Sequence, residues 1–97
     1  MSGVDERRVL SELALLMLEE LALRGGRIKA KHWRTYRAVS FWAGEGTAST
    51  IVKRLAEGGF LRIEGDYVEL AKPIKPPRGL KEIEGRALAL AKSLYKG

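Results

Sequence analysis

The sequence contains no cysteine, no asparagine and no glutamine, and its only histidine is His32. Without cysteine the chain has no disulfide, cysteine nucleophile or thiolate metal site, and one histidine is too few for a histidine-rich metal site. The segment Gly44-Glu45-Gly46 lacks the third glycine of a dinucleotide-binding loop, and the acidic residues are scattered over helix faces. We therefore expect no enzymatic activity, no metal and no cofactor, and a solvated, structural role for His32.

Cysteine, asparagine and glutamine are also the thermolabile residue types. Their absence beside 18 Lys and Arg and 12 Asp and Glu is typical of proteins from hyperthermophiles. Chance in a chain of 97 residues is the alternative explanation. This feature concerns habitat and indicates nothing about function.

A long apolar run is missing as well. The stretch Leu13–Leu18 stops at Glu19-Glu20 and is too short to cross a bilayer, and the polar N-terminus has no signal-peptide pattern. With 45% hydrophobic and 31% charged residues, the chain has the composition of one globular domain. We expect a cytoplasmic protein that does not bind membranes.

Positive charge is present in excess. The net charge is +6; residues 24–54 alone sum to +7 and residues 72–97 to +5, whereas residues 1–23 and 55–71 each sum to −3. Concentrated positive charge is the electrostatic signature of a polyanion partner. The alternative is a solvated surface on which oppositely charged segments pair with each other.

Two long helices are predicted, one at each end of the chain. Residues 4–24 have apolar residues at helical spacing, and Ser2 with Asp5 is compatible with a capping box. Alternating spacings of three and four from Leu80 onward predict a last helix that ends at about Lys96. Both helices carry more apolar residues than one small core needs. We therefore expect them to pack on each other, within one chain or between the two chains of a homodimer.

The middle of the chain is predicted to be a short strand followed by two helices. Residues 27–30 form a strand that can pair with the later hairpin, and residues 31–43 form a helix with aromatic residues on one face. Residues 47–58 form the next helix, with Thr47 as its N-cap. Its apolar stripe consists of Ala48, Ile51, Val52 and Leu55. Helix, short glycine-containing turn and helix together make a helix-turn-helix.

Residues 61–70 predict a β-hairpin with Gly65-Asp66 as a two-residue turn. The register then pairs Glu64 with Tyr67, Ile63 with Val68, Arg62 with Glu69 and Leu61 with Leu70. One face, with Leu61, Ile63, Val68 and Leu70, is wholly apolar, and the other holds an opposite-charge pair. A slip by one residue would turn charges toward the core, so we expect this register to hold.

The order helix, short strand, helix, helix and hairpin resembles the winged helix-turn-helix superfamily over about residues 5–71. The most specific stretch is TASTIVKRLAEGGFLRIEGDYVEL, which is similar to many archaeal and bacterial winged-helix regulators. The implied fold is α+β and mostly helical, with three helices and a β-hairpin wing in residues 1–71. A proline-rich connection at 72–79 leads to an additional C-terminal helix at 80–97, which packs on the first helix or forms a dimer interface.

By this resemblance, the outer face of the helix at 47–58 enters the major groove of duplex DNA, and a basic segment at 24–37 contacts phosphates. The candidate DNA-binding residues are Thr47, Ser49, Thr50, Lys53, Arg54, Arg27, Lys29, Lys31, Arg34 and Arg37. Because Asn and Gln are absent, base recognition depends on guanine contacts and on DNA shape. The acidic wing tip, Glu64-Gly65-Asp66, departs from wings that touch DNA, so we expect it to be structural or to face a protein partner.

The sequence therefore predicts a small transcriptional regulator that binds duplex DNA as a homodimer. Two alternatives remain open. One is a non-specific nucleic-acid binder (chromatin-like, single-stranded, or RNA- and ribosome-associated), in which Trp33 and Tyr36 stack on bases instead of belonging to the core. The other is a protein-interaction domain in a replication or transcription assembly, which uses the acidic wing and the apolar helices.

Overall fold

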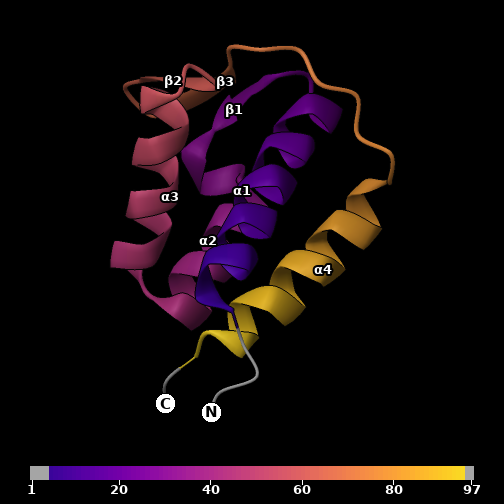
Figure 1. The fold of residues 1–97 in the computed structure, drawn as a ribbon. Helices are drawn as coiled ribbons and strands as arrows, with labels where there is room; N and C mark the ends of the chain where they lie inside the picture. Colours follow the sequence, from indigo (N-terminus) through magenta and orange to yellow (C-terminus); the bar gives the residue numbers. More distant parts are fainter. Residues whose placement is uncertain (1–4, 96–97) are drawn as a thin grey trace.

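The computed structural model of the protein describes residues 5–95. Its elements are α1 (Glu6–Leu23), β1 (Arg27–Lys29), the 3-10 turn η1 (Ala30–His32), α2 (Arg34–Ala43), α3 (Glu45–Glu57), β2 (Leu61–Glu64), β3 (Tyr67–Leu70) and α4 (Leu80–Ser93). The described chain is α+β and mostly helical, and its small sheet lies at one end of the helices (Figure 1). None of the helices in residues 5–95 is long and apolar enough to span a membrane.

Helix α1 lies between α3 and α4 and contacts all three other helices (Figure 1). Its fully buried residues Leu13, Met17 and Leu21 repeat at the spacing of one helix face. Side chains from α2, α3, the sheet and α4 complete one continuous apolar cluster around them. The described residues therefore share a single core, which is built on α1.

The start of α1 differs slightly from the predicted helix. Asp5 is the N-cap, and its carboxylate accepts a hydrogen bond from the Arg8 amide at 3.4 Å. A carboxylate at this position also suits the positive end of the helix dipole. Ser2, the other half of the predicted capping box, lies outside the described residues.

The last helix, α4, packs against α1 and α2 of the same chain, so the predicted pairing of the first and last helices is intramolecular. The connection at 71–79 contains neither helix nor strand. Arg78 in this connection lies 3.4 Å from the buried carboxylate of Glu19, which ties the connection to α1. Helix α4 ends at Ser93, earlier than predicted; Lys96 lies outside the described residues.

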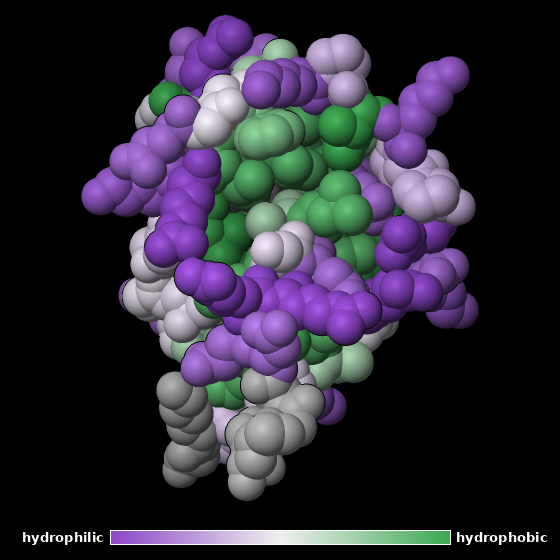
Figure 2. Space-filling model, in the orientation of Figure 1, coloured by the Kyte–Doolittle hydropathy of each residue, from purple (hydrophilic) through white to green (hydrophobic). Residues whose placement is uncertain are grey.

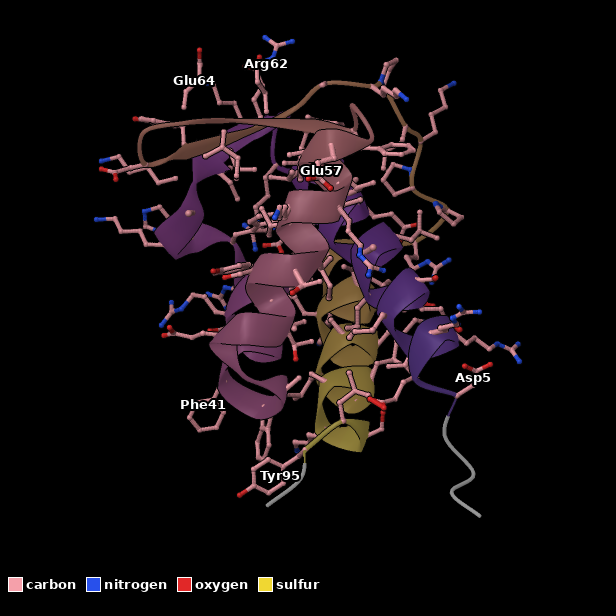
Figure 3. The ribbon with its side chains drawn as sticks, turned by 60° about the vertical axis from the view of Figure 1, so that its left-hand side comes forward. Asp5, Phe41, Glu57, Arg62, Glu64 and Tyr95 are labelled. Atoms are coloured by element: carbon pink, nitrogen blue, oxygen red, sulfur yellow. The ribbon has the colours of Figure 1, made fainter. Side chains whose placement is uncertain are left out.

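The three strands form an antiparallel sheet in the order β1-β3-β2. The predicted hairpin register is confirmed at all four pairs, and the predicted pairing of the first strand with the hairpin is confirmed too. Leu61 and Val68 are buried in the core. The prediction that Ile63 is part of a buried face is wrong: Ile63 is 51% exposed, because the turn end of the hairpin extends beyond α3 (Figure 3).

The second helix begins at Arg34, later than predicted. Ala30–His32 form a 3-10 turn, and Trp33 is extended, with φ −84° and ψ 91°. This backbone lets the Trp33 indole enter the core, where it is 1% exposed and its Nε1 donates to the Met17 carbonyl oxygen at 3.1 Å. Tyr36 stacks on the indole with ring centroids 5.4 Å apart. Trp33 is therefore a core residue and does not offer its ring to nucleic-acid bases.

Helix α3 begins at Glu45, and its N-cap is Gly44, so the prediction of Thr47 as N-cap is wrong. Gly44 has φ 100°, a conformation that residues with a side chain rarely adopt, and this single glycine turns the chain from α2 into α3. Thr47 lies inside the helix, where its hydroxyl donates to the Ala43 carbonyl oxygen at 3.0 Å. The apolar stripe is confirmed: Ala48, Ile51 and Leu55 are buried and Val52 is half-buried.

Candidate nucleic-acid interface

The ten candidate residues lie on three parts of the fold. Five belong to α3, two to β1 on the outer face of the sheet, and three to η1 and α2. These three parts differ in what surrounds the basic side chains, and this difference decides which cations are available to a polyanion.

The outer face of α3 carries cations that form no ion pair with a carboxylate of residues 5–95. Packing of the apolar stripe into the core leaves Ser49, Thr50 and Lys53 exposed. Within residues 5–95, neither Lys53 nor Arg54 forms a side-chain ion pair. Glu57, near the end of the same helix, is exposed and also forms no ion pair with the described residues (Figure 3). Uncommitted Lys and Arg donors are the groups that bind phosphates and guanine edges.

The threonine hydroxyls of α3 donate hydrogen bonds to backbone carbonyl oxygens one turn earlier. Thr47 donates to the Ala43 carbonyl oxygen at 3.0 Å, and Thr50 donates to the Gly46 carbonyl oxygen at 2.8 Å. Each hydroxyl keeps acceptor capacity, so it can receive a hydrogen bond from a base amino group without breaking these contacts. Thr47 is half-buried, which makes it the least accessible of the five α3 candidates.

Two further candidates, Arg27 and Lys29, lie on the outer face of the sheet beside acidic residues. Arg27 Nη2 is 3.9 Å from Glu64 Oε1, and on the same face Arg62 Nη1 is 3.9 Å from Glu69 Oε1. Cross-strand pairing places these opposite charges together. Much of the positive charge on this face is therefore compensated within the protein.

Lys29 and Lys31 border the turn of the hairpin. The Ala30 amide donates to the Asp66 carbonyl oxygen at 2.8 Å, which fixes η1 beside the turn. The two lysines line a hollow together with Gly65 and Asp66, and neither lysine has an ion pair among residues 5–95. The acidic hairpin tip thus lies next to two lysines, which weakens the repulsion that it would exert on a phosphate.

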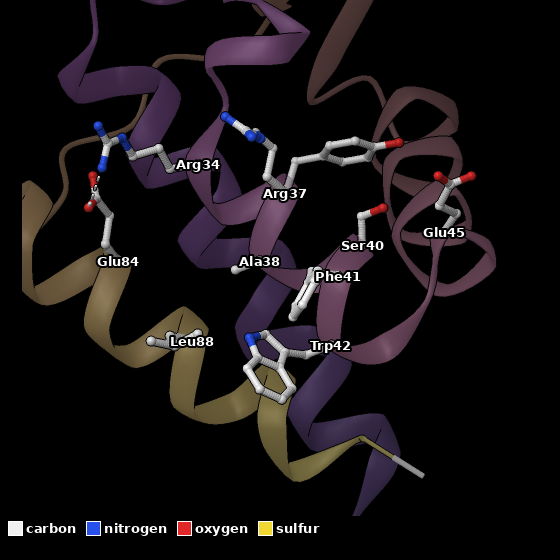
Figure 4. Close-up of a pocket in the computed structure, with 10 residues that line it drawn as sticks. Arg34, Arg37, Ala38, Ser40, Phe41, Trp42, Glu45, Glu84 and Leu88 are labelled. Carbon is white, nitrogen blue, oxygen red and sulfur yellow. Dashed lines mark ion pairs between the residues drawn. The ribbon is translucent and has the colours of Figure 1, made fainter. Parts of the chain in front are cut away.

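Arg34 and Arg37 line an open groove of about 770 Å³ between α2 and α4 (Figure 4). Arg34 Nη1 is 3.8 Å from Glu84 Oε1 of α4. Arg37 donates to the Lys31 carbonyl oxygen at 3.4 Å and has no ion pair within the described chain. The structure therefore brings these two arginines to a groove that is separate from the uncommitted cations of α3.

A second open groove, of about 540 Å³, lies between α1 and α3. Arg54 lines it from α3 and Arg7 from α1, together with a mainly apolar set that includes Leu10, Ala14, Ile51, Leu55 and Phe60. Figure 2 shows apolar side chains gathered between α3 and α1 and surrounded by hydrophilic ones. Arg54 consequently borders both the outer face of α3 and this groove.

The polar group that positions the basic segment is Glu20, which was not predicted from the sequence. Glu20 of α1 is fully buried, and its carboxylate accepts a hydrogen bond from Arg24 Nε at 2.7 Å. It also accepts hydrogen bonds from the start of α2: from the Arg34 amide at 2.9 Å and from the amide and hydroxyl of Thr35 at 2.8 and 2.7 Å. The carboxylate thereby satisfies orphan amides at the start of α2 and suits its dipole. The available signal was that Glu20 follows Met17 by three residues, on the apolar stripe of α1.

Among residues 5–95, no three histidine or acidic side chains are grouped closely enough to hold a metal ion. Comparison with protein-family models, with curated proteins and with solved structures finds no match to the chain. The function is therefore inferred from the geometry of the chain itself.

Proposed function

We propose that the protein is a small winged helix-turn-helix regulator that binds duplex DNA through the outer face of α3. The observation that carries this proposal is the pair Lys53 and Arg54, which have no ion pair in the described chain and belong to a helix whose other side is buried. The element order and the strand order β1-β3-β2 agree with the family resemblance of the sequence.

In this proposal α3 lies in the major groove, which is wide enough to admit a helix. Lys53 and Arg54 donate to guanine O6 and N7 or to phosphate oxygens, and Ser49 and Thr50 contact phosphates or base edges. Lys29 and Lys31, at the hairpin turn, add phosphate contacts that position the domain without specifying sequence. Compensated cations such as Arg62 take no direct part.

The test is a titration of labelled duplex DNA with the wild-type protein and with the Lys53→Ala/Arg54→Ala variant at several salt concentrations. Wild-type affinity should fall steeply with salt, and the log–log slope should become shallower by about 1.8 in the variant if both side chains contact phosphates, since each contact contributes about −0.9. The variant should fold normally, because both side chains are exposed.

A matched control keeps the net charge of that variant. Lys75→Ala/Lys81→Ala removes two exposed lysines from the connection and from α4, neither of which has an ion pair in the described chain. This control should retain most of the affinity. Equal losses in the two double variants would mean that net charge, and not the face of α3, determines binding.

A second candidate function is non-specific nucleic-acid binding, and one observation favours it. Helix α3 carries two acids, Glu45 and Glu57, and two bases, so its formal charge is zero. Lys29 and Lys31 lie outside α3 and, like its two bases, form no ion pair within residues 5–95. The same titration separates the two functions. Similar affinity for unrelated duplexes, single-stranded DNA and RNA, with greater loss in Lys29→Ala/Lys31→Ala than in the α3 variant, would favour this second function.

A further inference from the structure

The largest exposed apolar side chain of the described fold lies at the end of α2. Phe41 is 76% exposed, the highest exposed fraction among the large apolar side chains of residues 5–95. It packs edge-on against Trp42, with ring centroids 5.1 Å apart, and Trp42 packs edge-on against Tyr95 at 5.5 Å. Phe41 and Tyr95 lie at the end of the molecule opposite the hairpin (Figure 3). Phe41 therefore contacts Trp42 edge-on and leaves most of its surface exposed.

The same face contains a hollow beside this protruding ring. Phe41 and Trp42 border the groove between α2 and α4, and Leu88, 39% exposed, faces it from α4 (Figure 4). A protrusion beside a hollow on one face suits a twofold interface, because each copy can then place its protrusion in the hollow of the other.

The charges on this groove favour a second copy over a polyanion. Its lining contains two arginines, Arg34 and Arg37, and two glutamates, Glu45 and Glu84, so its charged side chains cancel although the protein carries a net charge of +6. A neutral face is where two copies of a cationic protein repel each other least. Arg34 and Glu84 already lie together, at 3.8 Å.

The remaining two charged residues of the lining have no ion pair within residues 5–95. They are Arg37 and Glu45, one of each sign, on neighbouring helices. A twofold arrangement that brings Arg37 of one copy to Glu45 of the other forms this ion pair twice. The lining therefore carries the opposite charges that a self-complementary interface pairs.

We propose that the α2–α4 face, centred on Phe41, binds a second copy of this chain and forms a twofold homodimer. The interface is distinct from a direct pairing of α1 with α4 between chains, because those helices pack on each other within one chain. It does not involve Lys53 or Arg54, which do not line this groove, but it does involve Arg34 and Arg37, two of the ten residues that the sequence predicted to contact DNA.

The first test measures mass by light scattering and the dimer Kd by sedimentation equilibrium, without nucleic acid. Wild type should be a dimer at high concentration, and Phe41→Ser should raise the Kd by about thirtyfold, because the substitution removes the central aromatic anchor from both copies. The matched control Ile63→Ser removes another exposed apolar side chain, 51% exposed, from the opposite end of the molecule and should leave the Kd unchanged.

The second test reverses the proposed ion pair. Arg37→Glu should raise the dimer Kd by at least about tenfold through like-charge contact with the partner's Glu45, and the double variant Arg37→Glu/Glu45→Arg should restore it. Circular dichroism checks that each variant is folded. A monomeric wild type, a dimer that Phe41→Ser does not weaken, or a charge-swapped protein as weak as Arg37→Glu would each overturn the proposal.

Discussion

The outer face of α3 and the outer face of the sheet both present basic side chains to solvent, but within residues 5–95 the sheet supplies partners for its arginines whereas α3 supplies none for its cations. On the sheet, Arg27 and Arg62 each lie 3.9 Å from a glutamate. On α3, Lys53 and Arg54 have no carboxylate within ion-pair distance among the described residues. A count of basic residues therefore does not show which cations are available to a polyanion; whether each cation has an acidic partner does.

Local geometry explains why the two faces differ. In the sheet, strand register sets Arg62 directly opposite Glu69, so the opposite charges meet across neighbouring strands. On α3, Lys53 precedes Glu57 by four residues, the less favourable order for a helical ion pair. The arginines of the sheet face are therefore compensated within the protein, while Lys29 at its edge and the cations of α3 stay available to an external anion.

The largest predicted effect concerns the buried carboxylate of Glu20, which joins α1 to the start of α2. Glu20→Ala should lower the free energy of unfolding by about 3–5 kcal/mol, because it leaves the Arg24 guanidinium and the first amides of α2 without their buried acceptor. Urea denaturation measures this loss. Glu82→Ala, which removes an exposed i,i+4 pair with Arg86, should cost no more than about 0.5 kcal/mol. Equal losses would show that Glu20 does not organise the fold.

The sequence was sufficient to predict the hairpin register and the buried stripe of α3, because period-two and helical spacing are local signals. It was not sufficient for the start of α2. That boundary depends on the Glu20 carboxylate bonding to the amides of Arg34 and Thr35, fourteen and fifteen residues further along the chain. The distribution of the ten candidate residues over three surfaces also depends on tertiary packing. A run of cations along the chain carries no information about which glutamates lie beside them.

The second predicted effect is that of a basic hairpin. Such a variant places unpaired cations on the sheet as well as on α3. Glu64→Lys/Asp66→Lys replaces two exposed acids with cations next to Lys29 and Lys31. If the hairpin lies beside the DNA backbone, affinity for duplex DNA near 0.1 M salt should rise by roughly fivefold to tenfold per new phosphate contact, and the salt slope should steepen.

The control for the basic hairpin makes the same charge change elsewhere. Glu12→Lys/Glu82→Lys alters exposed positions on α1 and α4 and gives the same net charge. It should increase affinity far less than the hairpin variant does. If both variants bind DNA equally well, the hairpin does not approach the backbone, and the orientation proposed for α3 is wrong.

The smallest predicted effect concerns Arg62, a cation on the outer face of the sheet that already has an acidic partner. Arg62→Ala should change duplex affinity by less than about twofold and leave the salt slope unchanged, because a cation already paired with Glu69 releases few counterions from DNA. Its cost in unfolding free energy should stay below about 1 kcal/mol, the usual range for an exposed ion pair, and a double-mutant cycle with Glu69→Ala measures the coupling. Lys53→Ala provides the contrast, with lower affinity and unchanged stability. A loss of affinity in Arg62→Ala equal to that in Lys53→Ala would mean that paired cations also contact DNA, and the distinction between the two faces would fail.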